Sequence, residues 1–388
     1  MHAEIMCPDR VKKQERGREA MVMKESCILA RLERLRDKMQ EKGLEAAFFQ
    51  NEANVSYLSG FSGGESFLLV TARDRGEANL FLTDSRYQEQ AEKECSAFQV
   101  ILYQGSNALP EAIKSLCLAN GCKTLGFDPH YISVERYEAF QASFGQEIQL
   151  QAASGLVEEL RIVKDAEEQK LLALACAATD RVFQRMCEFI QADLTEREIE
   201  WQLLTLIHQE GCQESFRTIV VSGSNGSLPH GVATDRRVEL GDFVTMDFGC
   251  LYQGYHADMT RTVCVGAPSA QQREIYDIVL QANLKAEAAL RAGLTGKEVD
   301  AVARNYIADK GYGAYFGHGL GHGVGLEIHE QLNLNPHGDI PLPAGTFVTV
   351  EPGIYLPGQM GVRIEDTVLV TEEGIENQFT SSKELFCL

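Results

Sequence analysis

The sequence predicts a two-domain protein of the mixed α/β (α+β) class, whose second domain is built from two copies of one structural unit. At 388 residues the chain is long enough for two domains of typical size. Short apolar runs alternate with helical stretches in its first part, and a helix-and-strand pattern repeats in its second part. We therefore expect a polar extension over residues 1–25, an α/β domain over 26–158 and a second domain over 159–388.

The first domain begins with an amphipathic helix over residues 26–42, because Ile28, Leu32 and Leu35 recur at helical spacing. Apolar runs and helical stretches then alternate, which is typical of a small domain with a mixed or parallel sheet. The expected strands cover 46–49, 66–71, 79–83, 99–103 and 124–127, and the expected helices cover 84–95 and 109–119.

Two segments of the chain have a distinctive composition. The Gly- and Ser-rich segment 59–66 matches no phosphate-binding pattern, so we expect either a plain turn or a loop beside a cleft. The highly charged segment 156–170 is the expected crossing between the domains, and it leads into a long helix that ends near Ile190.

The second domain contains an internal repeat. Residues 194–200 (LTEREIE) match 294–300 (LTGKEVD), and in both a Thr is followed three residues later by a Glu, the signature of a capped helix start. Residues 243–249 (FVTMDFG) match 347–353 (FVTVEPG) at nearly the same offset. Two matches in the same order predict two helix–helix–hairpin units related by a pseudo-two-fold axis.

Composition excludes several classes of protein. The chain has 36 Lys and Arg against 56 Asp and Glu, a net charge of −20, and would repel nucleic-acid phosphates. No apolar run approaches the ~18–20 residues of a membrane span, and the mean hydropathy is −0.18. The 11 cysteines form no CxxC pair, and the N-terminus has no secretory signal. We therefore expect reduced thiols, a cytoplasmic location and no nucleic-acid or membrane partner.

Four carboxylates occupy related places in the two repeats. Asp247 in the first strand motif corresponds to Glu351 in the second. On the return strands they are followed by Asp258 and Glu365. Carboxylates that converge inside a protein repel one another unless cations neutralise them. Two neighbouring divalent ions are the simplest partners for four such groups.

Histidines gather in one glycine-rich stretch, residues 317–330 (GHGLGHGVGLEIHE), which contains His318, His322 and His329. The glycines allow backbone and side chains to approach a buried site closely. An imidazole among carboxylate ligands shifts the preference from Mg²⁺ or Ca²⁺ toward Mn²⁺, Co²⁺, Zn²⁺ or Fe²⁺. The role of His256, two residues before Asp258, stays open at this point.

These motifs resemble those of the pita-bread-fold metallopeptidases. Because a first domain is present, the chain looks like the aminopeptidase P/prolidase branch, the Xaa-Pro peptidases. The resemblance implies a creatinase-like N-terminal α/β domain and a C-terminal pita-bread domain with pseudo-two-fold internal duplication. It rests on the motifs SLPHG (227–231), MDFGCLYQGYHADMTRT (246–262), GHGLGHGVGLEIHE (317–330), VEPGIY (350–355) and GVRIEDTVLVT (361–371).

The resemblance implies a ligand set and its ions. The family's five metal ligands fall on Asp247, Asp258, His322, Glu351 and Glu365. Two divalent ions are implied, with Mn²⁺ expected first and Co²⁺ or Zn²⁺ as alternatives. A homodimer is also implied.

The resemblance further implies roles for residues around the ions. His230 and His318 would contact a proline-containing peptide near its proline. His329 would stabilise the tetrahedral intermediate, and Arg363 would position substrate or neighbouring groups. Glu351 is the expected proton shuttle between the attacking water and the leaving proline nitrogen.

The expected function is that of an Xaa-Pro aminopeptidase, a di-metal exopeptidase that cleaves the Xaa-Pro bond at peptide N-termini. The alternative, an Xaa-Pro dipeptidase, needs a group that captures the substrate carboxylate. The segment 330–335 (EQLNLN) contains no arginine for that purpose, although Arg363 or Arg86 could serve. A catalytically silent binding protein of the same fold is a third hypothesis, against which the complete ligand set argues.

Overall fold

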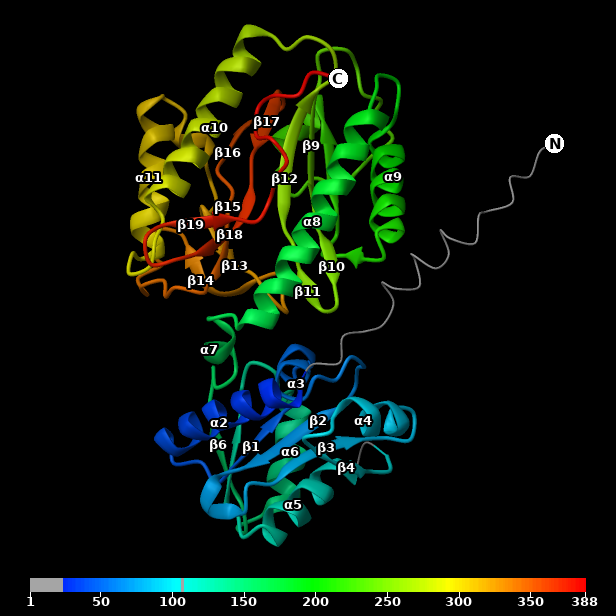
Figure 1. The fold of residues 1–388 in the computed structure, drawn as a ribbon, viewed down its shortest axis with the longest axis vertical. Coiled ribbons are helices and arrows are strands. Elements are labelled where there is room, and N and C mark those ends of the chain that lie inside the picture. The colour runs from blue at the N-terminus through cyan, green and yellow to red at the C-terminus, as the bar shows by residue number, and fades with distance from the viewer. Residues whose placement is uncertain (1–23, 106–107) are drawn as a thin grey trace, which may run out of the picture. The chain divides into compact units, whose positions relative to one another are not determined.

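The computed structural model describes residues 24–105 and 108–388, which form two compact units (Figure 1). Among the described residues, one unit ends at Arg161 and the other runs from Ile162 to Leu388. The expected polar extension over residues 1–25 lies outside the described residues, except for its last two positions.

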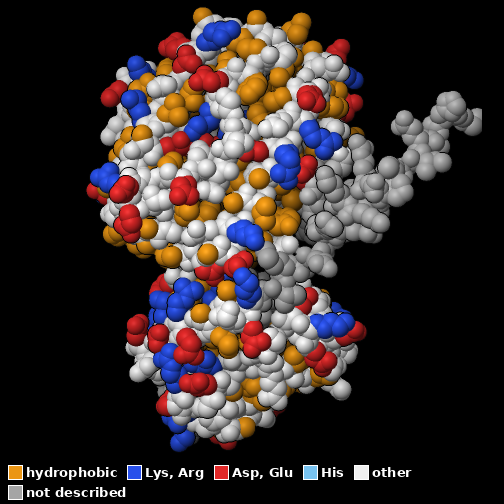
Figure 2. All heavy atoms as spheres, in the orientation of Figure 1, with side chains coloured by type: hydrophobic (Ala, Val, Ile, Leu, Met, Phe, Trp, Pro, Cys, Tyr) orange, Lys and Arg blue, Asp and Glu red, His pale blue; other side chains and the backbone are white. Residues whose placement is uncertain are grey.

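The visible surface carries charges of both signs. In Figure 2, acidic and basic side chains are interspersed over the face shown, so the net charge of −20 does not take the form of one acidic patch there. Within the described part of the chain, no helix is both long enough and apolar enough to cross a bilayer. Each described cysteine is a free thiol.

The first unit contains a mixed six-stranded sheet with the strand order β4-β3-β2-β1-β5-β6. β1, β5 and β6 run parallel, as do β3 and β4, whereas β1, β2 and β3 form an antiparallel meander. The strands are β1 (Ala46–Phe49), β2 (Phe67–Thr71), β3 (Asn79–Thr83), β4 (Gln99–Leu102), β5 (Thr124–Phe127) and β6 (Gln149–Ala152). Every residue of β1 and β2 is buried, so these strands form the centre of the core.

The helices of this unit include those predicted from the sequence and further ones that were not. In α2, Ile28, Leu32 and Leu35 are buried, as their spacing predicted. Helices α3 and α6 and strand β6 were not predicted. Both helices begin at capping side chains, Asn51 and Ser133, which accept hydrogen bonds from backbone N–H groups three residues later. The described helices are α2 (Glu25–Glu41), α3 (Glu52–Ser59), α4 (Gln88–Glu94), α5 (Leu109–Ala119), α6 (Val134–Phe144) and α7 (Glu158–Arg161).

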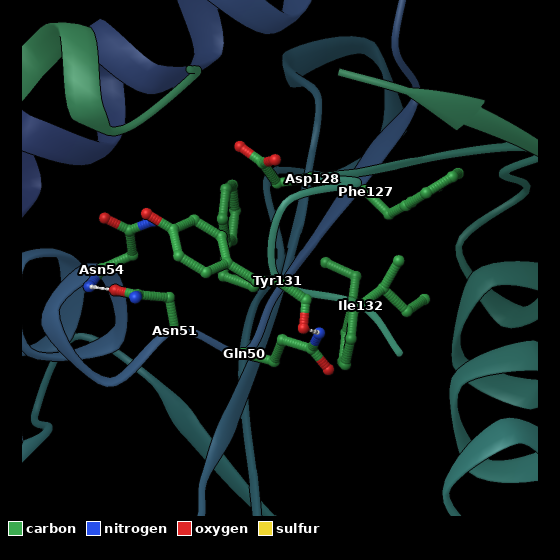
Figure 3. A pocket seen from close by; sticks show the side chains of 9 residues that line it. Gln50, Asn51, Asn54, Phe127, Asp128, Tyr131 and Ile132 are labelled. Carbon is green, nitrogen blue, oxygen red and sulfur yellow. Dashed lines mark hydrogen bonds between the residues drawn. The ribbon is translucent and has the colours of Figure 1, made fainter. Parts of the chain in front are cut away.

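A small hollow lies at the carboxyl ends of the parallel strands β1 and β5 (Figure 3). Such strand ends bind ligands in many α/β proteins. Here the side-chain amide of Gln50 donates to the carbonyl of Tyr131, and the Oδ1 atom of Asn51 accepts from the backbone N–H of Asn54 at 2.9 Å. The free volume is about 10 Å³, roughly one water-sized sphere, which leaves no room for a peptide or a nucleotide.

The second unit consists of two successive halves with helices followed by strands. Figure 1 shows α8 and α9 on one side of the strands and α10 and α11 on the other. The first half contains α8 (Ala166–Phe189), α9 (Glu196–Gln209), β7 (Gln213–Glu214), β8 (Ile219–Ser222), β9 (Phe243–Phe248), β10 (Cys250–Tyr252), β11 (Tyr255–His256) and β12 (Met259–Cys264). The second half contains α10 (Ala270–Ala289), α11 (Gly296–Asp309), β13 (Gly321–Gly323), β14 (Glu330–Leu334), β15 (Phe347–Val350), β16 (Gly353–Leu356), β17 (Met360–Arg363), β18 (Asp366–Val370) and β19 (Ile375–Asn377).

The strands of the second unit form related sheets in its two halves. The first half contains the sheet β12-β9-β8, and the second contains β14-β13-β15-β18-β19. The small sheets β11-β10-β7 and β16-β17 complete the unit. The strand that carries each predicted motif pairs antiparallel with its return strand, β9 with β12 and β15 with β18.

The repeat predicted from the sequence is present at the level of single hydrogen bonds. Thr195 Oγ1 accepts from the backbone N–H of Glu198 at 3.1 Å, and Thr295 Oγ1 accepts from that of Glu298 at 3.2 Å. In each case the Glu carboxylate accepts from the backbone N–H of the Thr at 2.8 Å. Equivalent capping boxes therefore start α9 and α11.

Each half also buries its own hydrophobic core. Leu203 and Met246 belong to the core of the first half, and Val299 and Val348 belong to the core of the second. All four side chains are fully buried. A smaller apolar cluster, with Leu172 from the first half and Phe347 from the second, joins the halves at their seam. The predicted site lies at the same seam.

Candidate metal and substrate site

The five predicted ligands come from both halves and converge at the seam. Asp247 lies on β9, and Asp258 directly precedes β12. His322 lies on β13, Glu351 follows β15, and Glu365 precedes β18. Two ligands are thus supplied by the first half and three by the second.

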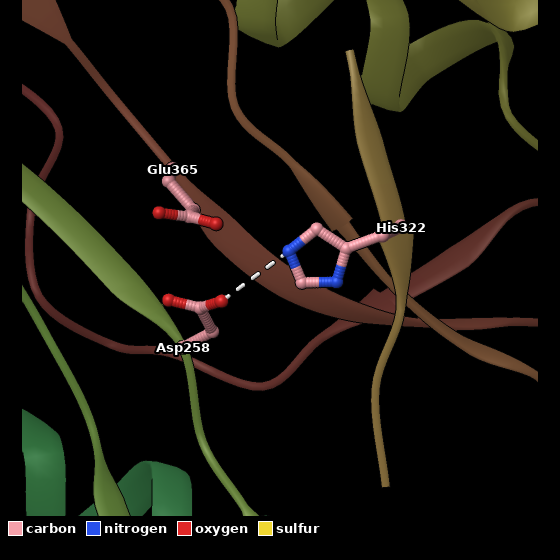
Figure 4. A group of neighbouring side chains, drawn as sticks. All are labelled: Asp258, His322 and Glu365. Atoms are coloured by element: carbon pink, nitrogen blue, oxygen red, sulfur yellow. Dashed lines mark ion pairs between the residues drawn. The ribbon is translucent and has the colours of Figure 1, made fainter. Parts of the chain in front are cut away.

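The distances show how closely these groups approach. Single ligand atoms of Asp258, His322 and Glu365 all lie within 4.8 Å of one another, and Figure 4 shows both carboxylates beside the imidazole ring. The Nε2 atom of His322 lies 3.5 Å from Asp258 Oδ2 and 3.6 Å from Glu351 Oε1. Asp247 Oδ2 accepts from Arg363 Nη2 at 2.5 Å.

Hydrogen bonds across the seam hold the carboxylates in place. The backbone N–H of Glu365 donates to the carbonyl of Thr260 at 3.1 Å, and Thr260 Oγ1 donates to Glu365 Oε2 at 2.6 Å. Thr367 Oγ1 donates to the carbonyl of Asp258 at 2.9 Å. Because each of these bonds joins one half to the other, the two halves jointly determine the geometry of the cluster.

The electrostatics of the cluster favour bound cations. Burial, and next the neighbouring carboxylates, raises the pKa values of Asp258 and Glu365 well above their ordinary range. Burial raises the pKa of Glu351 to about 8. The Oδ1 atoms of Asp247 and Asp258 are buried and have no hydrogen-bond partner among the described residues. Buried carboxylate oxygens without donors are suitable ligands for divalent cations, so these residues fit the ions that the sequence implies.

The buried histidines His318 and His322 are neutral, which is the form of imidazole that can bind a metal ion. Burial lowers the pKa values of His322 and His318 to about 4, so both imidazoles are neutral at pH 7. His322 Nδ1 lies 3.0 Å from the carbonyl oxygen of Gly323. A proton on Nδ1 leaves the Nε2 lone pair facing the carboxylates, where it can bind a metal ion.

A glycine brings His322 close to the glutamate strand. A Cβ atom at Gly321 would lie 2.0 Å from the carbonyl oxygen of Thr349 on β15. The backbone N–H of His322 donates to Thr349 Oγ1 at 3.0 Å. β13 therefore approaches β15 more closely than any residue with a side chain at position 321 would allow.

A cavity of about 250 Å³ opens beside the cluster. This volume lies just below the roughly 300–1,000 Å³ of drug-sized ligand sites, so the cavity suits a small ligand. Asp258 and Glu365 belong to the cluster but not to the cavity wall. The lining residues are Pro229, His230, Asp247, His318, Gly319, Gly321, His322, His329, Asn333, Asn335, Glu351 and Arg363.

Tyr355 is a residue of this site that the sequence reasoning missed. Its Oη atom accepts from Arg363 Nη1 at 2.8 Å and lies 3.1 Å from His318 Nε2. Burial raises the pKa of Tyr355 to about 12, so its hydroxyl keeps a proton that can be donated to His318. The tyrosine is the last residue of the motif 350–355, so the motif contained the signal.

A buried ion pair supports the loop that carries His329. Lys164 Nζ lies 3.0 Å from Glu330 Oε2, with 2% and 5% of the two side chains exposed. Glu330 Oε1 accepts from the backbone N–H of Leu326 at 2.9 Å. The carboxylate next to His329 thus fixes the turn of the loop, and the His329 and His322 ring centroids lie 4.4 Å apart.

The roles of two further residues were left open by the sequence. His256 Nδ1 contacts Ser215 Oγ at 2.9 Å, and His256 does not line the cavity. Arg86 belongs to the first unit, where it forms ion pairs with Asp84 and Glu65. His256 is therefore not part of the cavity wall, and Arg86 is paired with two carboxylates of its own unit.

The fold and the site define a class of protein: an internally duplicated α/β unit that holds a carboxylate–histidine cluster for divalent ions beside a ligand-sized cavity. The metallopeptidase family M24 matches residues 170–372, and the creatinase/prolidase N-terminal domain matches residues 31–163. The chain belongs to the metallopeptidase family M24. The predicted resemblance to the Xaa-Pro peptidases, with a creatinase-like N-terminal domain and a pita-bread domain, is confirmed.

Individual relatives match almost the whole chain. The Xaa-Pro dipeptidase of Pyrococcus furiosus is 38% identical, over 92% of this chain and 99% of the relative. The solved structure of an Xaa-Pro dipeptidase from Bacillus anthracis is 40% identical, with a TM-score of 0.89 over 93% of this chain and 100% of that one. An X-Pro aminopeptidase structure from Thermotoga maritima is 37% identical, with a TM-score of 0.85 over 92% of this chain and 99% of that one.

Proposed function

We propose that this protein is an Xaa-Pro dipeptidase, which hydrolyses the Xaa-Pro bond of dipeptides with two divalent ions. The observation that carries the proposal is the cluster of buried carboxylates and a neutral histidine at the edge of a small cavity. Relatives named Xaa-Pro dipeptidase match more than nine tenths of the chain. They favour the dipeptidase, the alternative in the sequence analysis, over the aminopeptidase that was expected first.

The ions of the proposed reaction would be held by the five converging side chains, Asp247, Asp258, His322, Glu351 and Glu365. Their mixed oxygen and nitrogen donors suit Mn²⁺, which we propose first, and also Co²⁺ or Zn²⁺. When bound, such ions polarise a scissile carbonyl and lower the pKa of water toward neutrality.

The residues of the chain then divide the remaining work. Glu351 takes a proton from the attacking water and passes it to the proline nitrogen as the peptide bond breaks. His329 donates to the oxyanion of the tetrahedral intermediate. His230 and His318 border the proline ring, and Arg363 positions substrate from the cavity wall.

A second candidate is the Xaa-Pro aminopeptidase, and one observation favours it. Among the described residues that line the cavity, Arg363 is the only Lys or Arg, and it already donates to Asp247 and Tyr355. Asn333 and Asn335, which also line the cavity, are neutral. A dipeptide places its carboxylate next to the proline, where a free cation would help to bind it.

One experiment separates these functions. The Mn²⁺-reconstituted protein is given Gly-Pro, Gly-Pro-Ala and Gly-Leu, and kcat/KM is measured for each. A dipeptidase cleaves Gly-Pro most efficiently, whereas an aminopeptidase cleaves Gly-Pro-Ala and leaves Gly-Pro intact. A protein that binds two ions and cleaves none of the three is the catalytically silent binding protein.

We also propose a homodimer in the cytoplasm. The free thiols of the described cysteines are consistent with a reducing compartment. Sedimentation velocity tests the dimer, and a monomer at micromolar concentration would contradict it.

A further inference from the structure

Behind the carboxylate cluster, one buried asparagine touches both strands that carry the glutamates. Asn283 lies on α10, which packs against β15, and none of its surface is exposed. Its Nδ2 atom donates to the carbonyl oxygens of Val350 at 2.8 Å and Ile364 at 3.3 Å. These residues directly precede Glu351 and Glu365, so one amide group joins the backbones of two proposed ligands.

The strand pairing is interrupted at these glutamates. The β15–β18 ladder ends where Val350 lies opposite Asp366. Beyond that point, the backbone N–H groups of Glu351 and Glu365 donate to two other segments of the chain. The pairing resumes where the carbonyl of Pro352 accepts from the backbone N–H of Ile364 at 3.5 Å and β16 pairs with β17. The amide of Asn283 therefore bridges the two glutamate-bearing segments within this short gap.

Lys383, in the segment after β19, orients this amide. Its Nζ atom lies 2.8 Å from Asn283 Oδ1. Because an ammonium only donates, the amide atom that faces it is the oxygen, and the NH₂ group faces the strands. The same ammonium lies 2.6 Å from Glu287 Oε2 and 2.8 Å from Asp366 Oδ2. Since Asp366 directly follows Glu365, Lys383 holds the second glutamate segment as well.

The charges around this amide balance. Arg261 Nη2 lies 2.6 Å from Asp366 Oδ1, so Lys383 and Arg261 face two carboxylates, those of Glu287 and Asp366. None of the four lines the cavity. A buried network whose charges are all paired rigidifies its surroundings, and removing one member leaves an uncompensated charge. This network is therefore suited to fixing backbone rather than to chemistry.

We propose that Lys383 and Asn283 are positioning residues that set the spacing of Glu351 and Glu365, and thereby the affinity of the site for divalent ions. The proposal rests on the proposed function, because the ions are those of the peptidase reaction. The proposal gives the segment after β19 a role in the metal site, although no side chain of that segment lines the cavity.

Mn²⁺ titration of the metal-free protein, without substrate, tests this directly. Asn283→Asp keeps the contact with Lys383 but removes both donors to the strands, and Lys383→Met removes the charge. We expect each to weaken Mn²⁺ binding about 10- to 100-fold, as do other partners that orient metal ligands. Lys383→Arg keeps the charge and should restore part of the affinity. Lys285→Met, on the same helix and over the ring of Tyr306, is the matched control and should bind like the wild type.

Wild-type Mn²⁺ affinity in either folded variant, Asn283→Asp or Lys383→Met, would overturn the inference. Hydrogen exchange on the unchanged protein provides a test that needs no variant, because coupling between two sites is reciprocal. The amides of residues 378–381 should exchange more slowly with Mn²⁺ bound than without it. Equal exchange overturns this inference alone, whereas a wild-type protein that binds no Mn²⁺ overturns the proposed function with it.

Discussion

Replacing Gly321 by alanine should separate the strands that carry His322 and Glu351. The added Cβ would lie 2.0 Å from the Thr349 carbonyl oxygen, and real Cβ contacts essentially never fall below 3.0 Å. β13 must therefore shift from β15 by the difference, 1.0 Å. Overpacking of this kind costs about 1–3 kcal/mol of folding free energy. A misplacement of about 1 Å in a catalytic arrangement costs roughly 100-fold in rate.

For a unit of this size, these energies correspond to a fall in Tm of about 2–12 °C. We expect Gly321→Ala to lose roughly 100-fold in kcat/KM for Gly-Pro, together with weaker Mn²⁺ binding. Gly317→Ala is the matched control, because in the same glycine-rich stretch its Cβ would meet no atom within 4 Å. Thermal unfolding and Gly-Pro hydrolysis measure both variants. If the two behave alike, close approach of β13 and β15 does not determine the site.

Three further predictions concern the ions, the loop and pH. Asp258→Asn should lose bound metal and activity together, and two ions per chain with full turnover would contradict its assignment. Lys164→Met removes the buried cation that lies 3.0 Å from Glu330 and should cost about 3–5 kcal/mol in urea unfolding. Lys297→Met is the control, because Lys297 forms an exposed ion pair with Asp339. Loss of that pair should cost less than about 1 kcal/mol. Burial raises the pKa of Glu351 from 4.5 to about 8, so the protonated form stabilises the metal-free protein. That stability is complete below pH 4.5 and is lost as the pH rises through about 8. The Tm of the metal-free protein should therefore fall as the pH rises from 4.5 to about 8. A Tm that rises instead would contradict the burial of the Glu351 carboxyl.

The second unit could be predicted from sequence because its signals are local and occur twice. Thr195 and Thr295 each begin a helix through hydrogen bonds to residues three positions away, which a short segment encodes. The correspondence of Asp247 with Glu351 predicted that the carboxylates converge, because each lies on or next to a strand that pairs with a return strand in its own half. The structure brings these groups together at the seam.

The residues that support the site from distant parts of the chain could not be predicted in this way. Tyr355 reaches His318 from 37 residues away, and Lys383 reaches Asn283 from 100 residues away. Tyr355 lies in the motif 350–355, but its contact with His318 and that of Lys383 with Asn283 are marked by no local pattern, because only the tertiary fold brings the partners together. In the first unit, α3 was missed for a different reason: Asn51 caps its start, but no Glu stands three residues later as it does in α9 and α11.

The hydrophobic cores of the second unit bear on how it unfolds. Each half has a main core, but Phe243 of the first half packs in the core of the second, and a smaller cluster spans both halves. Two of the five proposed ligands come from one half and three from the other, so bound ions stabilise only the docked pair. Bound ions would therefore stabilise the docking of the two halves in addition to their proposed role in catalysis. The loaded unit is therefore expected to melt at a higher temperature than the metal-free unit.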